Sequence, residues 1–139
     1  MTDSSSAVSP STAPTYDYAD WPIVTIYMPS QRLTAEGFEK HLIACGEPYK
    51  RGTPFGIIIV MGDHPPLTAA ERQASAQAMA THYAGNPGLL RGAALVVSSA
   101  AEHGVVRALG WVAKPPYPFE TFKLLAAAKT WLREQIAMA

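Results

Sequence analysis

The chain has 139 residues, of which 48% are hydrophobic and 16% are charged, and its 11 basic side chains balance its 11 acidic ones. This length and apolar content suffice for one complete hydrophobic core, but not for two ordinary domains. A formal net charge of zero offers no general attraction for phosphate backbones, so we do not expect a nucleic-acid partner. No apolar run approaches the roughly 18 residues of a membrane span, so we expect no integral membrane segment.

The first part of the chain is predicted to be an arm rather than part of the domain. Residues 1–16 are rich in Ser, Thr, Ala and Pro, and they lack the cationic and apolar regions of a secretory signal. We therefore expect a disordered arm over residues 1–20 and a single domain over residues 21–139. Cys45 is the only cysteine, which suits a reduced compartment, and we predict a cytoplasmic protein.

Residues 23–28 begin the domain with a predicted buried strand, which is rich in β-branched and aromatic side chains and stops at Pro29. Thr34 has the position of a helix cap, and Leu33 and Phe38 have the spacing of a hydrophobic staple. The inward stripe of this first helix is predicted to hold Phe38, Leu42 and Cys45.

Residues 55–61 are an unbroken apolar run, which predicts a strand at the centre of a sheet. Residues 62–66 break this strand. Thr68 and Glu71 then form a capping-box pattern that opens an Ala-rich helix. The apolar positions that keep helical spacing in it are Ala76, Met79, Ala80 and Tyr83.

The last third of the chain predicts two further strand and helix pairs. Residues 92–97 form a strand, and residues 99–102 repeat the capping-box pattern before a helix over about residues 100–113. Residues 117–122 form a short strand, and residues 124–136 form the closing helix. Its predicted inward side chains are Leu124, Ala128, Trp131 and Leu132. Because strands alternate with helices, we expect a mostly parallel sheet with right-handed crossovers.

Over residues 22–137 the sequence resembles the SpoIIAA-like, STAS-type family of small bacterial domains. The resemblance rests on residues 33–38 after the first strand, on the central strand with its Gly62-Asp63 exit, and on the run from Leu109 through Pro115 and Phe122 to Leu132. It implies an α/β fold with a four- to five-stranded, mostly parallel sheet packed with four helices. These motifs are structural, so they indicate the fold more than the function.

The resemblance also implies a function class without catalysis. Members of the family act as anti-sigma-factor antagonists switched by phosphorylation or as regulatory modules of larger assemblies, and a related branch looks like lipid carriers. The phosphorylated loop of the switching members corresponds here to residues 63–71, which lack the serine pair. Thr68 is the nearest hydroxyl and therefore the candidate phosphorylation site, although a plain role as a helix cap is the favoured interpretation.

Polar residues that could carry chemistry gather where strands are predicted to end. Ligands of open α/β sheets bind outside the carboxyl ends of the strands, and Asp63, His64 and His103 are expected there. No metal-ligand spacing, phosphate loop or nucleophile motif accompanies them, so we predict no metal, no cofactor and no enzyme. His41 and His82 are interpreted as surface residues. Lys50 and Arg51 are interpreted as a solvated loop pair.

The helix over residues 100–113 is apolar almost all round, so it is either covered on two sides or offered to a partner. We favour a protein-interaction module whose contact residues are Val105, Val106, Leu109, Trp111, Asp63 and His64. Family habit further implies self-association with a second copy. The alternative is a carrier of a small apolar ligand or lipid beneath the same helix, and an enzyme using Asp63, His64 and His103 ranks third.

Overall fold

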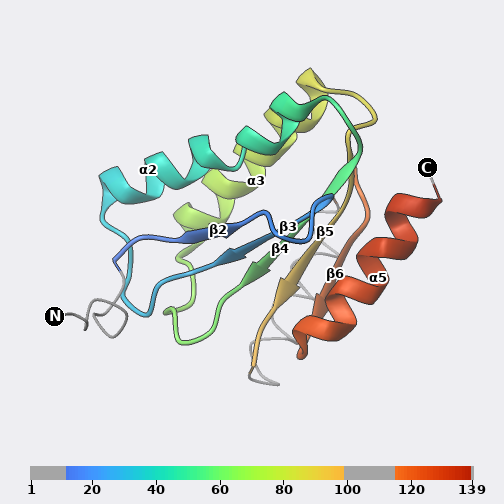
Figure 1. Ribbon diagram of the computed structural model, residues 1–139. Coiled ribbons are helices and arrows are strands. Elements are labelled where there is room, and N and C mark those ends of the chain that lie inside the picture. Colours follow the sequence, from blue (N-terminus) through green and yellow to red (C-terminus); the bar gives the residue numbers. More distant parts are fainter. Residues whose placement is uncertain (1–11, 99–114, 139) are drawn as a thin grey trace, which may run out of the picture.

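The computed structural model describes residues 12–98 and 115–138, which form a sheet between two helical layers. In chain order, the elements are β2 (Thr15–Asp17), β3 (Ile23–Tyr27), α2 (Ala35–Ala44), the 3-10 helix η1 (Glu47–Arg51), β4 (Phe55–Val60), α3 (Ala69–Gly85), β5 (Leu90–Val96), β6 (Phe119–Phe122) and α5 (Leu125–Ala137). Helices α2 and α3 cover one face of the sheet and α5 covers the other (Figure 1).

The sheet has five strands in the order β2-β3-β4-β5-β6. Strands β3 to β6 run parallel to one another, and only β2 is antiparallel to its neighbour. The expected mostly parallel α/β fold is therefore confirmed. Three of the four expected helices are α2, α3 and α5. The expected helix over about residues 100–113 lies outside the described residues.

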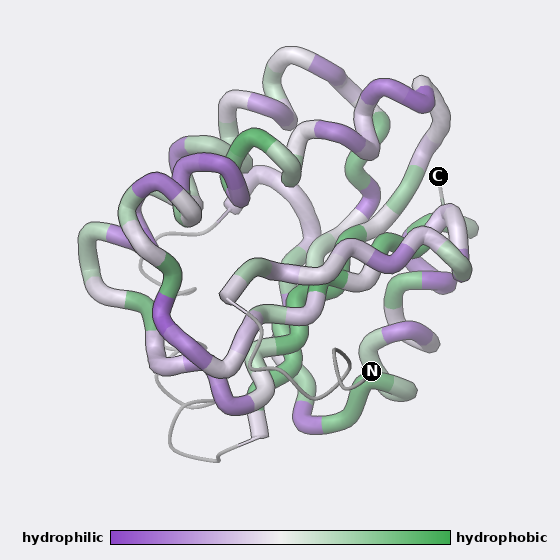
Figure 2. The backbone as a smooth tube through the Cα atoms, turned by 60° about the vertical axis from the view of Figure 1, so that its left-hand side comes forward, coloured by the Kyte–Doolittle hydropathy of each residue, from purple (hydrophilic) through white to green (hydrophobic). Residues whose placement is uncertain are grey.

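Strand β4 is the centre of the molecule, as its unbroken apolar sequence predicts. Phe55 and Ile57 pack into the core beneath α2 and α3, while Ile58 packs into the core beneath α5. All three side chains are fully buried. Hydrophobic residues line the central strands, and hydrophilic residues concentrate on the helices (Figure 2). Burial on both faces removes the need for the alternating pattern of a half-exposed strand.

Helix α5 approaches the sheet closely because two glycines face it from neighbouring strands. Gly56 of β4 and Gly92 of β5 are paired in register, and the fully buried side chain of Leu132 lies over both. A Cβ atom at Gly56 would lie 2.6 Å from Cδ2 of Leu132, and one at Gly92 would lie 3.1 Å from it. The absence of side chains at both glycines therefore leaves the space that Leu132 occupies, which we call the glycine seat.

Three predicted inward positions are corrected by the structure. Leu124 is 69% exposed, because it precedes α5 as an extended N-cap residue and is not part of the helix face that packs on the sheet. In α3, Met79 is buried and Tyr83 packs at the edge of the core, whereas Ala76 and Ala80 are exposed. Their small methyl groups leave little apolar surface to bury, so the larger side chains decide which face of α3 turns inward.

The sheet begins earlier than the sequence indicates. Strand β2 lies within residues 1–20, which were expected to be a disordered arm, and it pairs with β3 from Thr15 opposite Tyr27 to Asp17 opposite Thr25. The boundary at residue 20 is therefore too late. Strand β2 has only three residues, and its place depends on its pairing with β3 and on the contacts of Tyr16 and Tyr18 with the core. Neither this pairing nor these contacts can be recognised from the local sequence.

The glycine seat under α5 gives the first testable prediction. In Gly56→Ala the new methyl group meets Leu132, which is fully buried and has little room to move, so we expect a loss of about 1–3 kcal/mol in the free energy of unfolding. Chemical denaturation measures this loss. The matched control is Gly85→Ala at the end of α3, where nothing lies within 4 Å of the added atom and stability should not fall. Equal stability of the two variants would contradict the close approach.

Candidate functional site: the carboxyl-end rim

The parallel strands β3, β4 and β5 end at one edge of the sheet, which we call the carboxyl-end rim and define as residues 28–34, 61–68 and 97–98. The backbone ladder continues into it, since Met28 donates to the carbonyl of Val60 over 2.9 Å and Met61 donates to the carbonyl of Val96 over 3.0 Å. The rim is visible at the lower part of Figure 1, where the chain leaves these strands. Its residues are thus direct extensions of the buried sheet.

His64 joins two segments of the rim from below its surface. Its Nδ1 lies 2.7 Å from the carbonyl oxygen of Pro29, and its backbone N–H donates to Met61 over 2.9 Å. Because a carbonyl only accepts hydrogen bonds, Nδ1 carries the proton and donates. The residue is only 4% exposed. His64, which was expected to contact a partner, is therefore buried and supports the rim through its hydrogen bond to Pro29.

Arg32 makes a second link between the same segments. Its guanidinium group pairs with Glu71 over 2.8 Å and donates to the carbonyl oxygen of Pro66 over 3.0 Å. A guanidinium fixed by two acceptors holds its loop more firmly than a single surface ion pair would. Together with His64, it fastens the loop after β4 to the loop after β3.

Asp63 stands on the outer side of this fastened loop. It follows Gly62, whose φ of 54° gives the left-handed turn that favours glycine. Asp63 is exposed, and among the residues that the structure describes no side chain or backbone group pairs with it. The rim thus exposes the carboxylate of Asp63, unpaired within the described ranges, on a loop that the bonds of His64 and Arg32 hold in place.

Thr68 begins α3 with the capping box that its sequence predicts. Its Oγ1 accepts a hydrogen bond from the backbone N–H of Glu71 over 3.1 Å, and the Glu71 carboxylate accepts one from the backbone N–H of Thr68 over 2.8 Å. Thr34 caps α2 with a single bond, because its Oγ1 accepts from the backbone N–H of Gly37 over 3.0 Å. Both predicted caps are confirmed, and Thr68 is exposed to solvent.

The remaining predicted site residues lie outside the described part of the chain. They are Val105, Val106, Leu109, Trp111 and His103. What the structure fixes is the start of their segment, because β5 ends at Val96 and its exit residue Ser98 is exposed at the rim. Within residues 12–98 and 115–138, no three His, Cys, Asp or Glu side chains are close enough together to hold a metal ion. Nor does any helix in these ranges have the length and apolar character to cross a membrane.

A buried polar cluster under β2 was missed by the sequence analysis. His41 is 5% exposed, which corrects its interpretation as a surface residue. Burial lowers the pKa of His41 to about 4 and so keeps its ring neutral near neutral pH. Nδ1 is hydrogen-bonded to the Tyr16 hydroxyl over 2.9 Å, and Nε2 lies 3.8 Å from Sγ of Cys45. Burial also raises the pKa of Cys45 to about 12, so the thiol is not a ready nucleophile.

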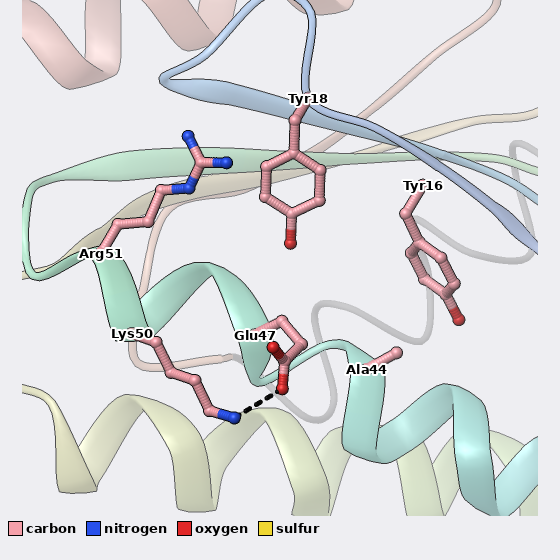
Figure 3. Close-up of a pocket in the computed structure, with 6 residues that line it drawn as sticks. All are labelled: Tyr16, Tyr18, Ala44, Glu47, Lys50 and Arg51. Carbon is pink, nitrogen blue, oxygen red and sulfur yellow. Dashed lines mark hydrogen bonds and ion pairs between the residues drawn. The ribbon is translucent and has the colours of Figure 1, made fainter.

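A second feature that the sequence did not indicate is an open depression between β2 and η1. Its volume is about 430 Å³, and it is lined by Tyr16, Tyr18, Ala44, Glu47, Lys50 and Arg51. Figure 3 shows Tyr18 and Tyr16 above the space, Arg51 beside it, and Lys50, Glu47 and Ala44 below it on η1 and at the end of α2. The adjacent basic residues Lys50 and Arg51 were the only local signal.

Comparison with known proteins supports the fold and leaves the function open. The sequence matches no model of a known protein family, and no curated protein matches it. Among solved structures, it is similar to an uncharacterized protein of the DUF3478 family, with a SpoIIAA-like fold, from Shewanella loihica PV-4. The TM-score is 0.59 at 15% sequence identity, and the match covers 86% of this chain and 92% of the other. The chain therefore has a SpoIIAA-like fold, as its motifs indicate.

The buried His41 gives a prediction for the pH dependence of stability. Its pKa is about 4 in the folded protein and about 6.5 when solvated, so the unfolded state binds the additional proton as the pH falls through this window. Between pH 7 and pH 5 we expect His41 to cost the folded state about 2 kcal/mol. In His41→Gln this part of the loss should disappear. Denaturation at both pH values measures it, and parallel pH profiles of the two proteins would contradict the burial of a neutral ring.

Proposed function

We propose that this protein is a non-enzymatic SpoIIAA-like module that binds another protein through its carboxyl-end rim and the apolar residues that follow β5. The observation that carries the proposal is the arrangement of the loop after β4. His64 and Arg32 hold this loop to the loop after β3, while Asp63 remains exposed and unpaired among the described residues. A surface that is ordered before binding loses less conformational entropy on association.

The roles within the rim differ from those expected from sequence. Asp63 is the proposed contact residue, because its carboxylate is accessible. His64 supports the contact indirectly, because its ring is buried and bonded to Pro29. A single exposed charge beside an apolar surface favours specificity and orientation more than affinity.

The proposed apolar part of the interface comprises Val105, Val106, Leu109 and Trp111. Their segment starts at Ser98 on the same edge as Asp63, which supports a shared surface. Tryptophan surrounded by aliphatic residues is a frequent anchor of protein interfaces. We propose Trp111 as that anchor.

Thr68 remains a proposed regulatory site. Its hydroxyl oxygen already caps α3, so that a phosphate there would meet the Glu71 carboxylate as well as the helix amino terminus. Arg32 and Arg72 both donate hydrogen bonds to backbone carbonyls of residues 66–67 beside Thr68. Modification would therefore disturb the same hydrogen bonds that hold the rim.

The alternatives keep the order that the sequence gives them. A carrier of an apolar ligand or lipid would need a pocket beneath residues 100–113, and retention of such a ligand in native mass spectrometry would favour it. An enzyme that uses Asp63, His64 and His103 is disfavoured by the buried, bonded ring of His64. Cytoplasmic location and association with a second copy remain predictions.

The proposal is tested by isolating the protein with its partners from its native host. We expect Asp63→Lys to reduce recovery of the specific partner at least about tenfold, because a reversed charge is placed against the partner surface. Trp111→Ser should remain folded and lose the partner as well. Quantitative mass spectrometry of the recovered proteins, with circular dichroism of each variant, measures both effects.

The matched control is Glu39→Lys, which makes the same change of charge at an exposed position of α2 outside the rim. It should retain the partner at the level of the unaltered protein. If Trp111→Ser unfolds, the tryptophan belongs to the core, and Asp63→Lys alone decides the case. Undiminished recovery with Asp63→Lys would overturn the proposal.

A further inference from the structure

We propose that the depression between β2 and η1 binds a small carboxylate carried on an aromatic or other apolar body. This site is separate from the rim of the proposed function. It lies beside Tyr18 and Trp21, which precede β3, and beside η1, which precedes β4, so it is at the edge where the parallel strands begin. The two sites therefore lie at opposite ends of the parallel strands, the rim at their carboxyl ends and this site at their amino ends.

Arg51 is the central group of the site, because its guanidinium lies over two aromatic rings while its N–H donors are free within the described part of the chain. Its guanidinium carbon lies 4.8 Å from the ring centroid of Tyr18 and 4.5 Å from that of Trp21. No hydrogen bond or ion pair to this guanidinium exists within residues 12–98 and 115–138. Stacking on aromatic faces orients the group while leaving its edge, with up to five N–H donors, for a ligand.

The platform under Arg51 is anchored in the core. The rings of Tyr18 and Trp21 are stacked, with centroids 6.0 Å apart and planes inclined by 13°. Trp21 in turn stacks on Phe55 over 5.8 Å, and Phe55 is fully buried in β4. Arg51 thus has a preferred place although it is an exposed residue, and a held guanidinium suits a planar, bidentate acceptor such as a carboxylate.

The charge of the site matches one negative charge. Lys50 is paired with Glu47 over 2.8 Å, so these two charges offset each other and Arg51 supplies the excess. The Glu47 carboxylate faces the same space as Lys50 (Figure 3), which disfavours a dianion such as a phosphate monoester. A singly charged carboxylate fits this balance better.

The walls of the site suit the apolar body of such a ligand. Tyr16 of β2 and Tyr18 just after it contribute their rings, and Ala44 contributes a methyl group from the end of α2 (Figure 3). Burial raises the pKa of Tyr18, so its hydroxyl stays protonated and can donate to the carboxylate. The volume of about 430 Å³ lies within the range of about 300–1,000 Å³ that is typical of small-molecule sites.

The test uses phenylacetate as the probe, followed by NMR of the isotopically labelled protein. We expect saturable shifts of the Trp21 indole and of the amides of Tyr18 and Arg51. Phenylacetamide has nearly the same shape without the charge, and phenyl phosphate carries more charge; both should bind more weakly. A probe that binds nowhere near these residues at millimolar concentration, a phenylacetamide that binds equally well or a phenyl phosphate that binds more tightly would overturn the proposal.

Variants locate the site and separate it from general charge effects. Arg51→Gln removes the charge from an exposed residue and should weaken phenylacetate binding about tenfold or more. The matched control is Lys40→Gln, which removes one positive charge from the exposed surface of α2 and should leave the affinity unchanged. Thermal unfolding checks that both variants fold. Unaltered affinity in a folded Arg51→Gln would also overturn the proposal, and it would leave the rim untouched.

Discussion

The contact of Leu132 with the paired glycines Gly56 and Gly92 is the constraint on which the rest of the structure depends. It brings α5 close enough to bury the second face of β4, while α2 and α3 bury the first. A strand covered on both faces can be apolar throughout, which explains the sequence of residues 55–60. The sheet is then packed on both faces, and the two ends of its parallel strands can carry groups with different roles.

The sequence predicts the elements that local physics determines. The apolar run of β4 and the capping residues Thr34 and Thr68 signal their structure through composition and spacing alone, and the structure confirms them. The buried state of His41 and His64 could not be predicted in this way. Each ring depends on a partner distant in sequence, the Tyr16 hydroxyl or the Pro29 carbonyl, and only the folded sheet brings these pairs together. Strand β2 was missed for the same reason, since it exists through its pairing with β3.

The two candidate sites lie at opposite ends of the parallel strands. At the carboxyl-end rim, buried His64 and the bonds of Arg32 hold a loop that exposes Asp63. At the opposite edge, the rings of Tyr18 and Trp21 hold Arg51 above a shallow depression. In both places a charged side chain is exposed, while the groups that position it are tied to the core. Such an arrangement is typical of recognition, because the binding group is ordered before the ligand arrives.

The claim that the rim belongs to the rigid part of the fold is tested most directly by amide hydrogen exchange. The account predicts that the backbone N–H of His64, which donates to Met61, is protected to a degree approaching that of the N–H groups of β4. Exchange of the His64 amide at the rate of an unstructured peptide, with β4 still protected, would show that the rim is not held by the sheet. That result would contradict the physical basis of the proposed interface.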